Sequence, residues 1–403
     1  MTAKSGPPFS RMLILGGIAL IAAVSVHGQV TSVDNTTSPP IPGIGHDYIK
    51  MFGETVNPAN GSLSLRIDLP TPKGRGLDVP FSILYSSSGV EHVMGAANGG
   101  GGWGSDTGQQ SGSGWTYSIP TLTTIQGIVS QYNPGPPPVT YSCYYYYSYT
   151  IRDWTGAAHP LGTMTAAQNP NDGSTGCNQS TNRPGSNLSS GDGFFQGITT
   201  VPTSPALPNP VTVADPDGTV YQFSPSANIL NANNVVSFWA SASSIEDRNG
   251  NIVYPSFSNG SNGISGSVTD TLGRTLASVS PIASNANTVA VSGQTGPYNQ
   301  SWESVPVSFS VTSTPTGSVP CTGIGVGPAQ GTNYVVQTLT LPNNKSYQFQ
   351  YDPTFGLLSK ITYPSGGYVS YTWGVNSQSE VSRLPPLLIS ASAFATRYTT
   401  LRR

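Results

Sequence analysis

Two pairs of neighbouring carboxylates have the types and spacing for acid–base chemistry. Asp215 and Asp217 lie in the segment DPDG, and Glu246 and Asp247 lie in the segment EDRNG. A glycosidase places two carboxyl groups about 5 to 10 Å apart on either side of a sugar bond. Both pairs coincide with turn signatures, in which aspartate accepts hydrogen bonds from the backbone that follows it. The sequence therefore favours a structural role for them and predicts no catalytic residue.

The histidines and cysteines do not show the spacing of a metal site or of a nucleophile. His46, His92 and His159 lie far apart in the chain, and no HExxH, HxH or CxxC pattern occurs. Such patterns are typical of zinc and thioredoxin-like sites. The Gly-x-Ser-x-Gly elbow of many hydrolases is absent as well. We therefore expect no cofactor, no bound metal and no enzymatic activity.

The three cysteines leave two interpretations open. In an oxidising compartment one disulfide can form, and Cys143 with Cys177, which flank a loop-rich segment, is the candidate pair. Alternatively, these two residues and Cys321 all remain unpaired thiols.

An Asp-x-x-Gly pattern recurs before segments with β character. It occurs at Asp215–Gly218 (DPDGTVYQF), Asp247–Gly250 (DRNGNIVY) and Asp270–Gly273 (DTLGRTLASV), with an outlying copy, DWTG, at Asp153. Aspartate can accept a hydrogen bond from the backbone two residues on, and glycine adopts the positive φ that closes a tight hairpin. The pattern therefore predicts a series of β-hairpins.

The segment YDPTFGLLSKITYPSGGYVSYTW has the same design. Tyr351, Asp352 and Gly356 precede one alternating strand, and a turn that contains Gly367 leads to a second strand with Tyr371. A single hairpin cannot bury its apolar face alone, so it must pack on a neighbour. This pattern predicts a repetitive β wall.

The composition is typical of strands and turns. Charged residues make up 8% of the 403 residues, against about 25% in an average soluble domain. Glycine (47) and proline (35) are abundant, whereas long helices are rich in Ala, Leu, Glu, Lys and Arg. We therefore predict an all-β fold. The net charge of −2 offers no electrostatic basis for binding nucleic acid.

The first block after the N-terminal region predicts two paired strands. In SLSLRIDL, residues 62–69, leucine or isoleucine occupies every second position, which is typical of a half-buried strand. VPFSILY, residues 79–85, predicts the returning strand. Together they predict an antiparallel, β-sandwich-like module.

The N-terminal residues have the organisation of a signal peptide. Lys4 and Arg11 precede the apolar residues 12–26, and small residues permit cleavage before Gln29. An uncleaved anchor is the alternative, but the apolar run is shorter than the ~20 residues that span a bilayer. After cleavage no segment is apolar enough to cross a membrane. We expect a secreted or cell-surface protein.

The tyrosine-rich run CYYYYSY, residues 143–149, has two interpretations. Its rings could form a platform for stacking sugars, or the run could be a strand with aromatic cross-strand pairs. The second is the more common arrangement, and we favour it.

The residues Tyr351, Asp352, Gly356, Gly367 and Tyr371 resemble the tyrosine–aspartate (YD) repeat of rearrangement-hotspot (RHS) proteins. The block GETVNPANGSLSLRIDLPTPKGRGLDVPFSILYSSSG is similar to the segment that opens the ordered region of many large bacterial RHS-like proteins. SIEDRNGN and DTLGRT fit the same lineage. The resemblance extends over about residues 46–375. It implies a secreted or surface-displayed β-rich chain whose repeats wind into a shell, which in some members encloses a C-terminal toxin.

The chain departs from this repeat pattern in two respects. It has one well-formed YD unit and several degenerate ones, and its last segment, LPPLLISASAFATRYTTLRR, abandons the Asp/Gly/Tyr pattern. We therefore expect a truncated member that represents the N-terminal portion of a longer design.

The predicted organisation has six parts: signal peptide 1–28, flexible linker 29–45, N-terminal β module 46–126, loop-rich insertion 127–200, degenerate hairpin array 201–375 and irregular tail 376–403. The predicted function is that of an exported, non-enzymatic structural or surface protein in an RHS-type assembly, for cell–cell interaction or toxin delivery. Its expected partner is a protein or a surface glycan, and the sequence assigns no oligomeric state. The alternative is a carbohydrate-binding or carbohydrate-active β module.

Overall fold

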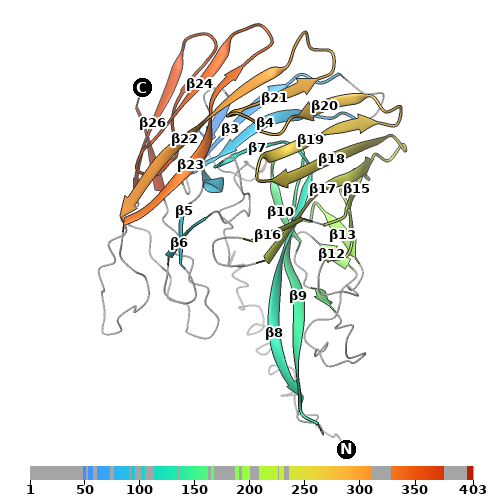
Figure 1. Ribbon diagram of the computed structural model, residues 1–403. Helices are drawn as coiled ribbons and strands as arrows, with labels where there is room; N and C mark the ends of the chain where they lie inside the picture. The colour runs from blue at the N-terminus through green and yellow to red at the C-terminus, as the bar shows by residue number, and fades with distance from the viewer. Residues whose placement is uncertain are drawn as a thin grey trace, which may run out of the picture. The chain divides into compact units, whose positions relative to one another are not determined.

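The computed structural model of the protein describes residues 49–50, 53–57, 61–72, 77–90, 92–95, 101–104, 113–133, 137–161, 165–167, 187–189, 193–199, 208–225, 227–230, 236–310, 328–375 and 397–402. Their regular secondary structure consists of β-strands, apart from one short 3₁₀ turn, η1 (Ser87–Gly89). The prediction of an all-β, antiparallel fold is confirmed (Figure 1). Among the residues described, no helix is long and apolar enough to cross a bilayer.

Two smaller sheets come from the N-terminal third of the chain. A five-stranded sheet has the order β1 (Ile49–Lys50), β2 (Glu54–Val56), β3 (Leu63–Leu69), β4 (Phe81–Ser86) and β7 (Trp115–Tyr117), and a hairpin joins β5 (His92–Gly95) to β6 (Gly101–Gly104). In β3 the residues at every second position are buried, as the alternation predicts. The two predicted strands of this block are thus confirmed as β3 and β4, which pair antiparallel.

The remaining strands, which we call the hairpin array, form one connected antiparallel network. They are β8 (Thr121–Asn133), β9 (Val139–Arg152), β10 (Ala158–Leu161), β11 (Thr165–Ala167), β12 (Asn187–Ser189), β13 (Gln196–Thr199), β14 (Val211–Ala214), β15 (Val220–Phe223), β16 (Ala227–Leu230), β17 (Val236–Glu246), β18 (Ile252–Gly260), β19 (Gly263–Asp270), β20 (Thr275–Val279), β21 (Ala286–Val291), β22 (Tyr298–Ser310), β23 (Pro328–Thr340), β24 (Ser346–Tyr351), β25 (Leu358–Thr362), β26 (Tyr368–Val375) and β27 (Arg397–Arg402). From β17 to β27 each strand pairs with the next along the chain.

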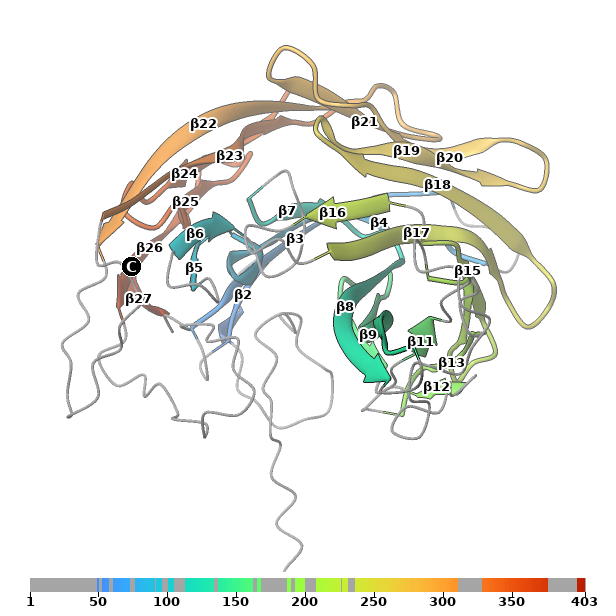
Figure 2. The same ribbon diagram turned by 60° about the horizontal axis from the view of Figure 1, so that its bottom comes forward.

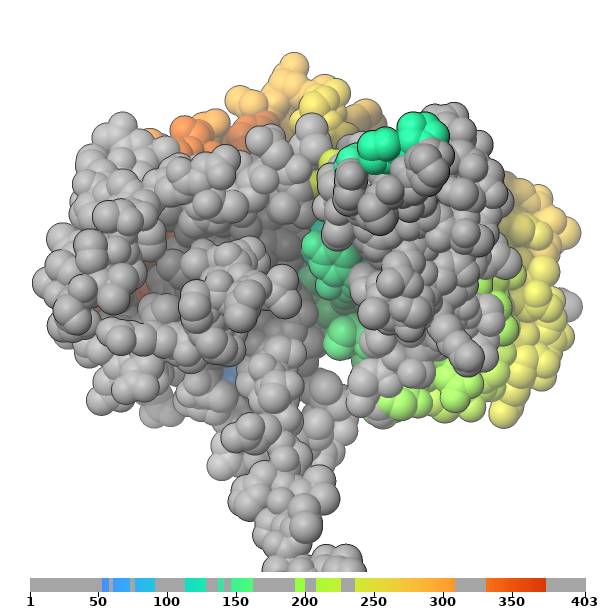
Figure 3. Space-filling view, turned by 90° about the horizontal axis from the view of Figure 1, so that it is seen from below, coloured from blue at the N-terminus to red at the C-terminus, as the bar shows by residue number. Residues whose placement is uncertain are grey.

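Strand β17 is the branch point of the array. Its first half, Val236–Ser241, pairs with β16 on one side and β8 on the other, whereas its second half pairs with β15 and β18. Strand β8 then continues into a long hairpin with β9. In Figure 3 the green atoms of this hairpin lie on the same side of the molecule as the lime and yellow atoms of the array.

The strands extend across regions for which the sequence predicts irregular structure. Residues 127–200 were expected to be loop-rich, yet the described part holds the end of β8 together with β9 to β13. Tyrosine, threonine and valine in these runs favour the long β8–β9 hairpin. Strand β27 similarly lies within the predicted tail. The domain boundaries themselves stay a prediction.

One face of the five-stranded sheet packs against one face of the array. Phe81 of β4 stacks with Phe257 of β18 at 6.3 Å between ring centroids, and Trp115 of β7 meets Phe349 of β24 edge-on at 4.7 Å. The inward residues of β21 and β26 are buried in the same cluster. Figure 2 shows β18 to β26 passing over β3, β4 and β7. We call this contact between the two sheets the seam.

The YD turn between β24 and β25 depends on glycine for two reasons. Gly356 has a φ of +67°, a backbone conformation that side-chain-bearing residues rarely adopt. A Cβ atom at this position would lie 2.0 Å from Asn333 Nδ2 and 2.8 Å from Val307 Cγ1. Both atoms belong to strands β22 and β23, so the turn has no room to move away.

Gly356→Ala is therefore expected to lower the free energy of unfolding by at least about 2 kcal/mol, measured by urea denaturation. Gly273→Ala separates the two causes, since Gly273 has a φ of +73° but no atom within 4 Å of the added Cβ. It should cost about 1 kcal/mol. Gly374→Ala, in open space without a positive φ, should be near neutral. Equal losses in all three variants would contradict the proposed crowding at Gly356.

Candidate functional site: the turn rim and the seam

The predicted Asp-x-x-Gly segments all form the same turn. In each, the aspartate N–H donates to the carbonyl four residues on, and the glycine N–H donates back to the aspartate carbonyl, at 2.9–3.1 Å. The glycines at positions 156, 218, 250 and 273 have φ values between 73° and 91°. This is a type I turn closed by a left-handed residue, a common three-residue hairpin connection. The predicted role of glycine is thereby explained at each position.

The aspartate side chains complete these turns. Oδ1 of Asp247 accepts the N–H groups of Asn249 and Asn251 at 2.8 and 2.9 Å, and Oδ2 accepts the Asn251 amide at 2.7 Å. Asp270 repeats the arrangement with Leu272 and Arg274. Hydrogen bonds from Asn251 to Asp247, and from Arg274 to Asp270, lower the pKa of each carboxyl group below its usual value.

Topology places these turns on one edge of the array, which we call the turn rim. Strands β9, β14, β17 and β19 run in the same direction, because they alternate with antiparallel partners. Their C-terminal turns, which begin at Asp153, Asp215, Asp247 and Asp270, therefore share an edge. The turn that begins at Asp352 follows β24, which runs the opposite way. These aspartates do not converge on a pocket.

The YD unit uses two turn types. Asp352 closes a four-residue loop, in which its N–H donates to Leu357 O and its Oδ1 accepts the Thr354 and Phe355 N–H groups. In the next turn Tyr363 takes the place of the aspartate, and Gly366, not Gly367, has the positive φ of 88°. Gly367 instead supplies the carbonyl that accepts the Tyr363 N–H at 2.8 Å.

The tyrosine run and the cysteines are the remaining residues for which the sequence made a prediction. The tyrosine run does form a strand, β9, as favoured above, and Tyr146 is fully buried against Phe238. The side chain of Cys143 and the whole of Cys177 and Cys321 lie outside the described residues, so the disulfide stays a prediction. Within the part that the structure describes, no three His, Cys, Asp or Glu residues are grouped as a metal site requires.

Two turns bring titratable groups together at the rim. Asp215 Oδ2 accepts the Tyr221 hydroxyl at 3.1 Å, and His159 Nε2 lies 3.6 Å from Asp153 Oδ2. Burial, followed by the hydrogen bond with Asp217, raises the pKa of Asp215 to about 6. Burial alone would raise the pKa of Asp153, but the polar contact with His159, the hydrogen bonds from Thr155 and the His159 charge outweigh it and lower that pKa.

This carboxylate group lacks the geometry of a sugar-cleaving site. Oδ1 of Asp215 already accepts the N–H groups of Asp217 and Thr219 at 3.1 and 3.0 Å, and Oδ2 accepts Tyr221. Asp217 Oδ1 accepts the Thr219 N–H and hydroxyl. The oxygens are thus directed at the turn's own donors, which supports the structural interpretation of the pair.

The raised pKa of Asp215 predicts a pH dependence of stability. A folded-state pKa of about 6, above the unfolded value of 3.8, stabilises the fold fully below pH 3.8. This contribution is lost as the pH rises through 6. The stability of the wild type relative to Asp215→Asn should therefore fall between pH 4 and pH 7 in urea titrations followed by tryptophan fluorescence. Asp247→Asn serves as the control, because the Asp247 pKa is lowered. A pH-independent difference for Asp215→Asn would contradict the assignment.

Polar side chains cross the seam at its centre. Tyr117 Oη of β7 donates to Gln300 Oε1 at 2.6 Å and accepts Asn287 Nδ2 at 3.0 Å. Asn287 Oδ1 accepts the indole N–H of Trp302 at 2.8 Å. Burial raises the pKa of Tyr117, so its hydroxyl remains a donor at neutral pH. Every hydrogen bond here joins groups that are at most 8% exposed.

The tyrosine of the YD pair belongs to the seam as well. Tyr351 Oη accepts the Trp115 indole N–H at 2.8 Å and donates to the Val336 carbonyl. One turn later, the Leu358 N–H donates to Tyr85 Oη at 2.9 Å. The YD unit is therefore fastened to the five-stranded sheet at two points.

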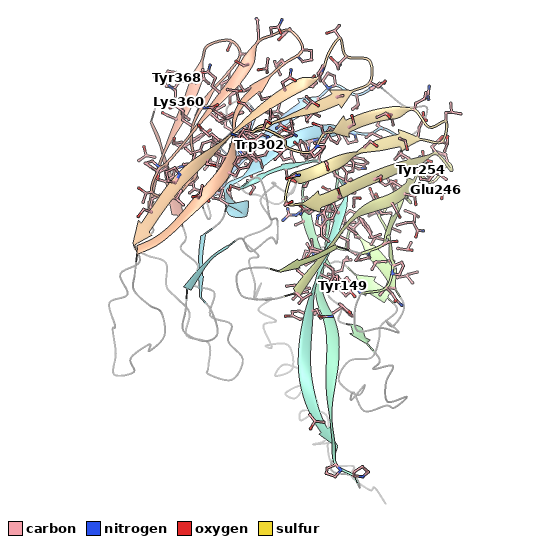
Figure 4. The ribbon with its side chains drawn as sticks, viewed as in Figure 1. Tyr149, Glu246, Tyr254, Trp302, Lys360 and Tyr368 are labelled. Carbon is pink, nitrogen blue, oxygen red and sulfur yellow. The ribbon has the colours of Figure 1, made fainter. Side chains whose placement is uncertain are left out.

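A small pocket opens beside these bonds. Its lining comes from both sheets: Trp115, Thr116, Tyr117, Gly263, Ile264, Ile282, Gln300 and Trp302. Its volume of about 10 Å³ is enough for about one water molecule. Figure 4 labels Trp302 on β22 at this position. Sequence reasoning missed these residues, although Asn287 stands out as a polar residue at an inward position of the valine-rich β21.

Tyr117→Phe is expected to destabilise the protein by about 1 to 3 kcal/mol, because it leaves Gln300 and Asn287 with buried unpaired groups. The measurement is the urea midpoint at constant m-value. Tyr254→Phe is the matched control, since Tyr254 is 42% exposed on β18 and should change the midpoint little. The seam account would be contradicted if both variants behaved alike.

Comparison with known proteins gives weak structural likeness alone. No protein-family model matches the chain, and no characterised protein matches its sequence. A TcdB2-TccC3 crystal structure aligns at 12% identity and a TM-score of 0.26, over 84% of this chain and 17% of that one. The Tc holotoxin pore of Photorhabdus luminescens aligns at 11% identity and 0.27, over 87% and 18%.

A porin-like protein from Bacteroides uniformis aligns at 14% identity and a TM-score of 0.22, over 71% of this chain and 96% of that one. The chain thus spans about a sixth of the length of the toxin chains. All three TM-scores lie below 0.5, so these likenesses assign no function to the chain.

Proposed function

We propose that the chain is an exported, non-enzymatic wall segment: a curved β-hairpin array backed by a small sheet, serving as part of a larger RHS-type shell. The observation that carries this proposal is the seam. The inward residues of successive hairpins join one buried cluster with those of the five-stranded sheet. The seam directs both tyrosine hydroxyls and indole N–H groups to partners inside the protein rather than to a ligand.

The sequence supports the finer parts of the proposal. The segment with Lys4, Arg11 and the apolar residues 12–26 supports export. The resemblance to YD repeats supports a shell that takes part in cell–cell interaction or toxin delivery. The hairpin turns also support a shell, because they allow each hairpin to pack on the next one in a chain that has few charged residues.

The carbohydrate-binding alternative depends on the tyrosine run. A sugar platform requires exposed rings, yet Tyr146 and Tyr149 are at most 1% exposed, and only Tyr147 among the rings described in that run reaches 36%. The geometry therefore favours the structural role.

Titration of the secreted protein with soluble glycans tests the proposal. If the chain is a wall segment, intrinsic fluorescence should stay unchanged over the whole glycan series, and limited proteolysis should leave a resistant fragment that contains both β3–β4 and β17–β26. Saturable quenching by a glycan that Tyr147→Ala abolishes would overturn the proposal. Separate digestion of the two sheets would overturn it as well.

A further inference from the structure

The seam buries a carboxylate at one end. Glu54 of β2 is 1% exposed and points inward beside Val56. Its Oε2 accepts the hydroxyl of Tyr363, which follows β25 in the array. A carboxylate removed from water is costly unless hydrogen bonds and an opposite charge compensate it. The Tyr363 hydroxyl compensates one of the two oxygens.

Two further buried polar atoms at Glu54 and Tyr371 have no hydrogen-bond partner. They are Oε1 of Glu54 and the hydroxyl of Tyr371, which is 5% exposed on β26. Burial and the nearby Glu54 charge both raise the pKa of Tyr371, as they do for Tyr363, so both phenols stay neutral. Buried polar atoms in native proteins nearly always have partners. Because the charge of Glu54 acts on the Tyr371 hydroxyl, the two unpartnered atoms together indicate a bound ligand.

The negative charge of Glu54 limits which ligand can bind beside it. Among the residues described, no Lys, Arg or His nitrogen forms an ion pair with Glu54. The two unpartnered atoms that a ligand could contact are both oxygens, the carboxylate Oε1 of Glu54 and the phenol oxygen of Tyr371. A divalent ion would require more carboxylates, as in calcium and magnesium sites. The chemistry fits a small monovalent cation.

We propose that Glu54 Oε1 and the Tyr371 hydroxyl bind a monovalent cation at the seam. Because Glu54 comes from the five-stranded sheet and both tyrosines come from the array, the cation links the two sheets. The cation binds the folded state and not the unfolded state. At concentrations above the dissociation constant, its stabilisation of the fold therefore grows with the logarithm of the cation concentration.

Thermal unfolding of the full secreted chain tests the site, with sodium, potassium, rubidium or ammonium chloride replaced stepwise by choline chloride at constant ionic strength. The Tm of the wild type should rise with the concentration of at least one small cation. Glu54→Gln should abolish this dependence, and Tyr371→Phe should shift it to at least about tenfold higher concentration. Identical Tm values in choline and in every small cation would overturn the proposal.

Matched controls come from exposed residues of the array. Glu246→Gln removes an exposed carboxylate, and Tyr368→Phe removes the hydroxyl of a 64% exposed tyrosine on the same strand as Tyr371. Figure 4 labels both residues. Each control should keep the wild-type cation dependence, and its loss in either one would contradict the assigned position.

A second readout does not depend on any variant. Crystals grown in rubidium chloride should show an anomalous peak between Glu54 and Tyr371. A water molecule there, with no anomalous signal at any rubidium concentration, would overturn the cation assignment. The function proposed above would survive that result, because it rests on the central seam contacts and not on Glu54.

Discussion

Burial of one apolar face per hairpin is the constraint on which the rest of this structure depends. Each hairpin exposes its inward face unless another sheet covers it, and the five-stranded sheet provides that cover through the rings of Phe81 and Trp115. Contact between apolar faces alone leaves their relative position poorly specified. Tyr117 and Tyr351 fix it. The Tyr117 hydroxyl of the five-stranded sheet bonds to Gln300 and Asn287 of the array, and the Tyr351 hydroxyl of the array accepts the Trp115 indole N–H of the five-stranded sheet.

The turns of the turn rim help to keep the apolar face of each hairpin directed inward. An aspartate that accepts the N–H groups two and four residues on, followed by a left-handed glycine, fixes where each hairpin reverses. Fixed reversal points keep the register, and in a strand a slip by one residue would move every inward side chain to the outer face. The acidic residues at the rim therefore have a folding role, which explains why their oxygens are directed at backbone donors.

Local patterns in the sequence predicted the local parts of this fold. The alternation in residues 62–69 and the Asp-x-x-Gly segments were sufficient for β3 and for the rim turns, because period-two burial and positive φ depend on neighbouring residues alone. The seam could not be predicted in this way. Asn287, Gln300 and Glu54 each bond across the seam to a partner more than a hundred residues away, Tyr117 or Tyr363, which no local pattern indicates. For the long β8–β9 hairpin the tyrosine run predicted a strand, but the length of β9 and its pairing with β8 were missed, because residues 127–200 were interpreted as loop-rich.

Native-state hydrogen exchange tests the central claim, that the array and the five-stranded sheet are stable only together, most directly. Amides of β3 and β4 and amides of β23 to β25 should open with one common free energy, equal to that of global unfolding, and with the same dependence on urea. An opening free energy for β3 and β4 several kcal/mol below that of β23 to β25 would show that the array remains folded when the five-stranded sheet unfolds. The account would then be contradicted.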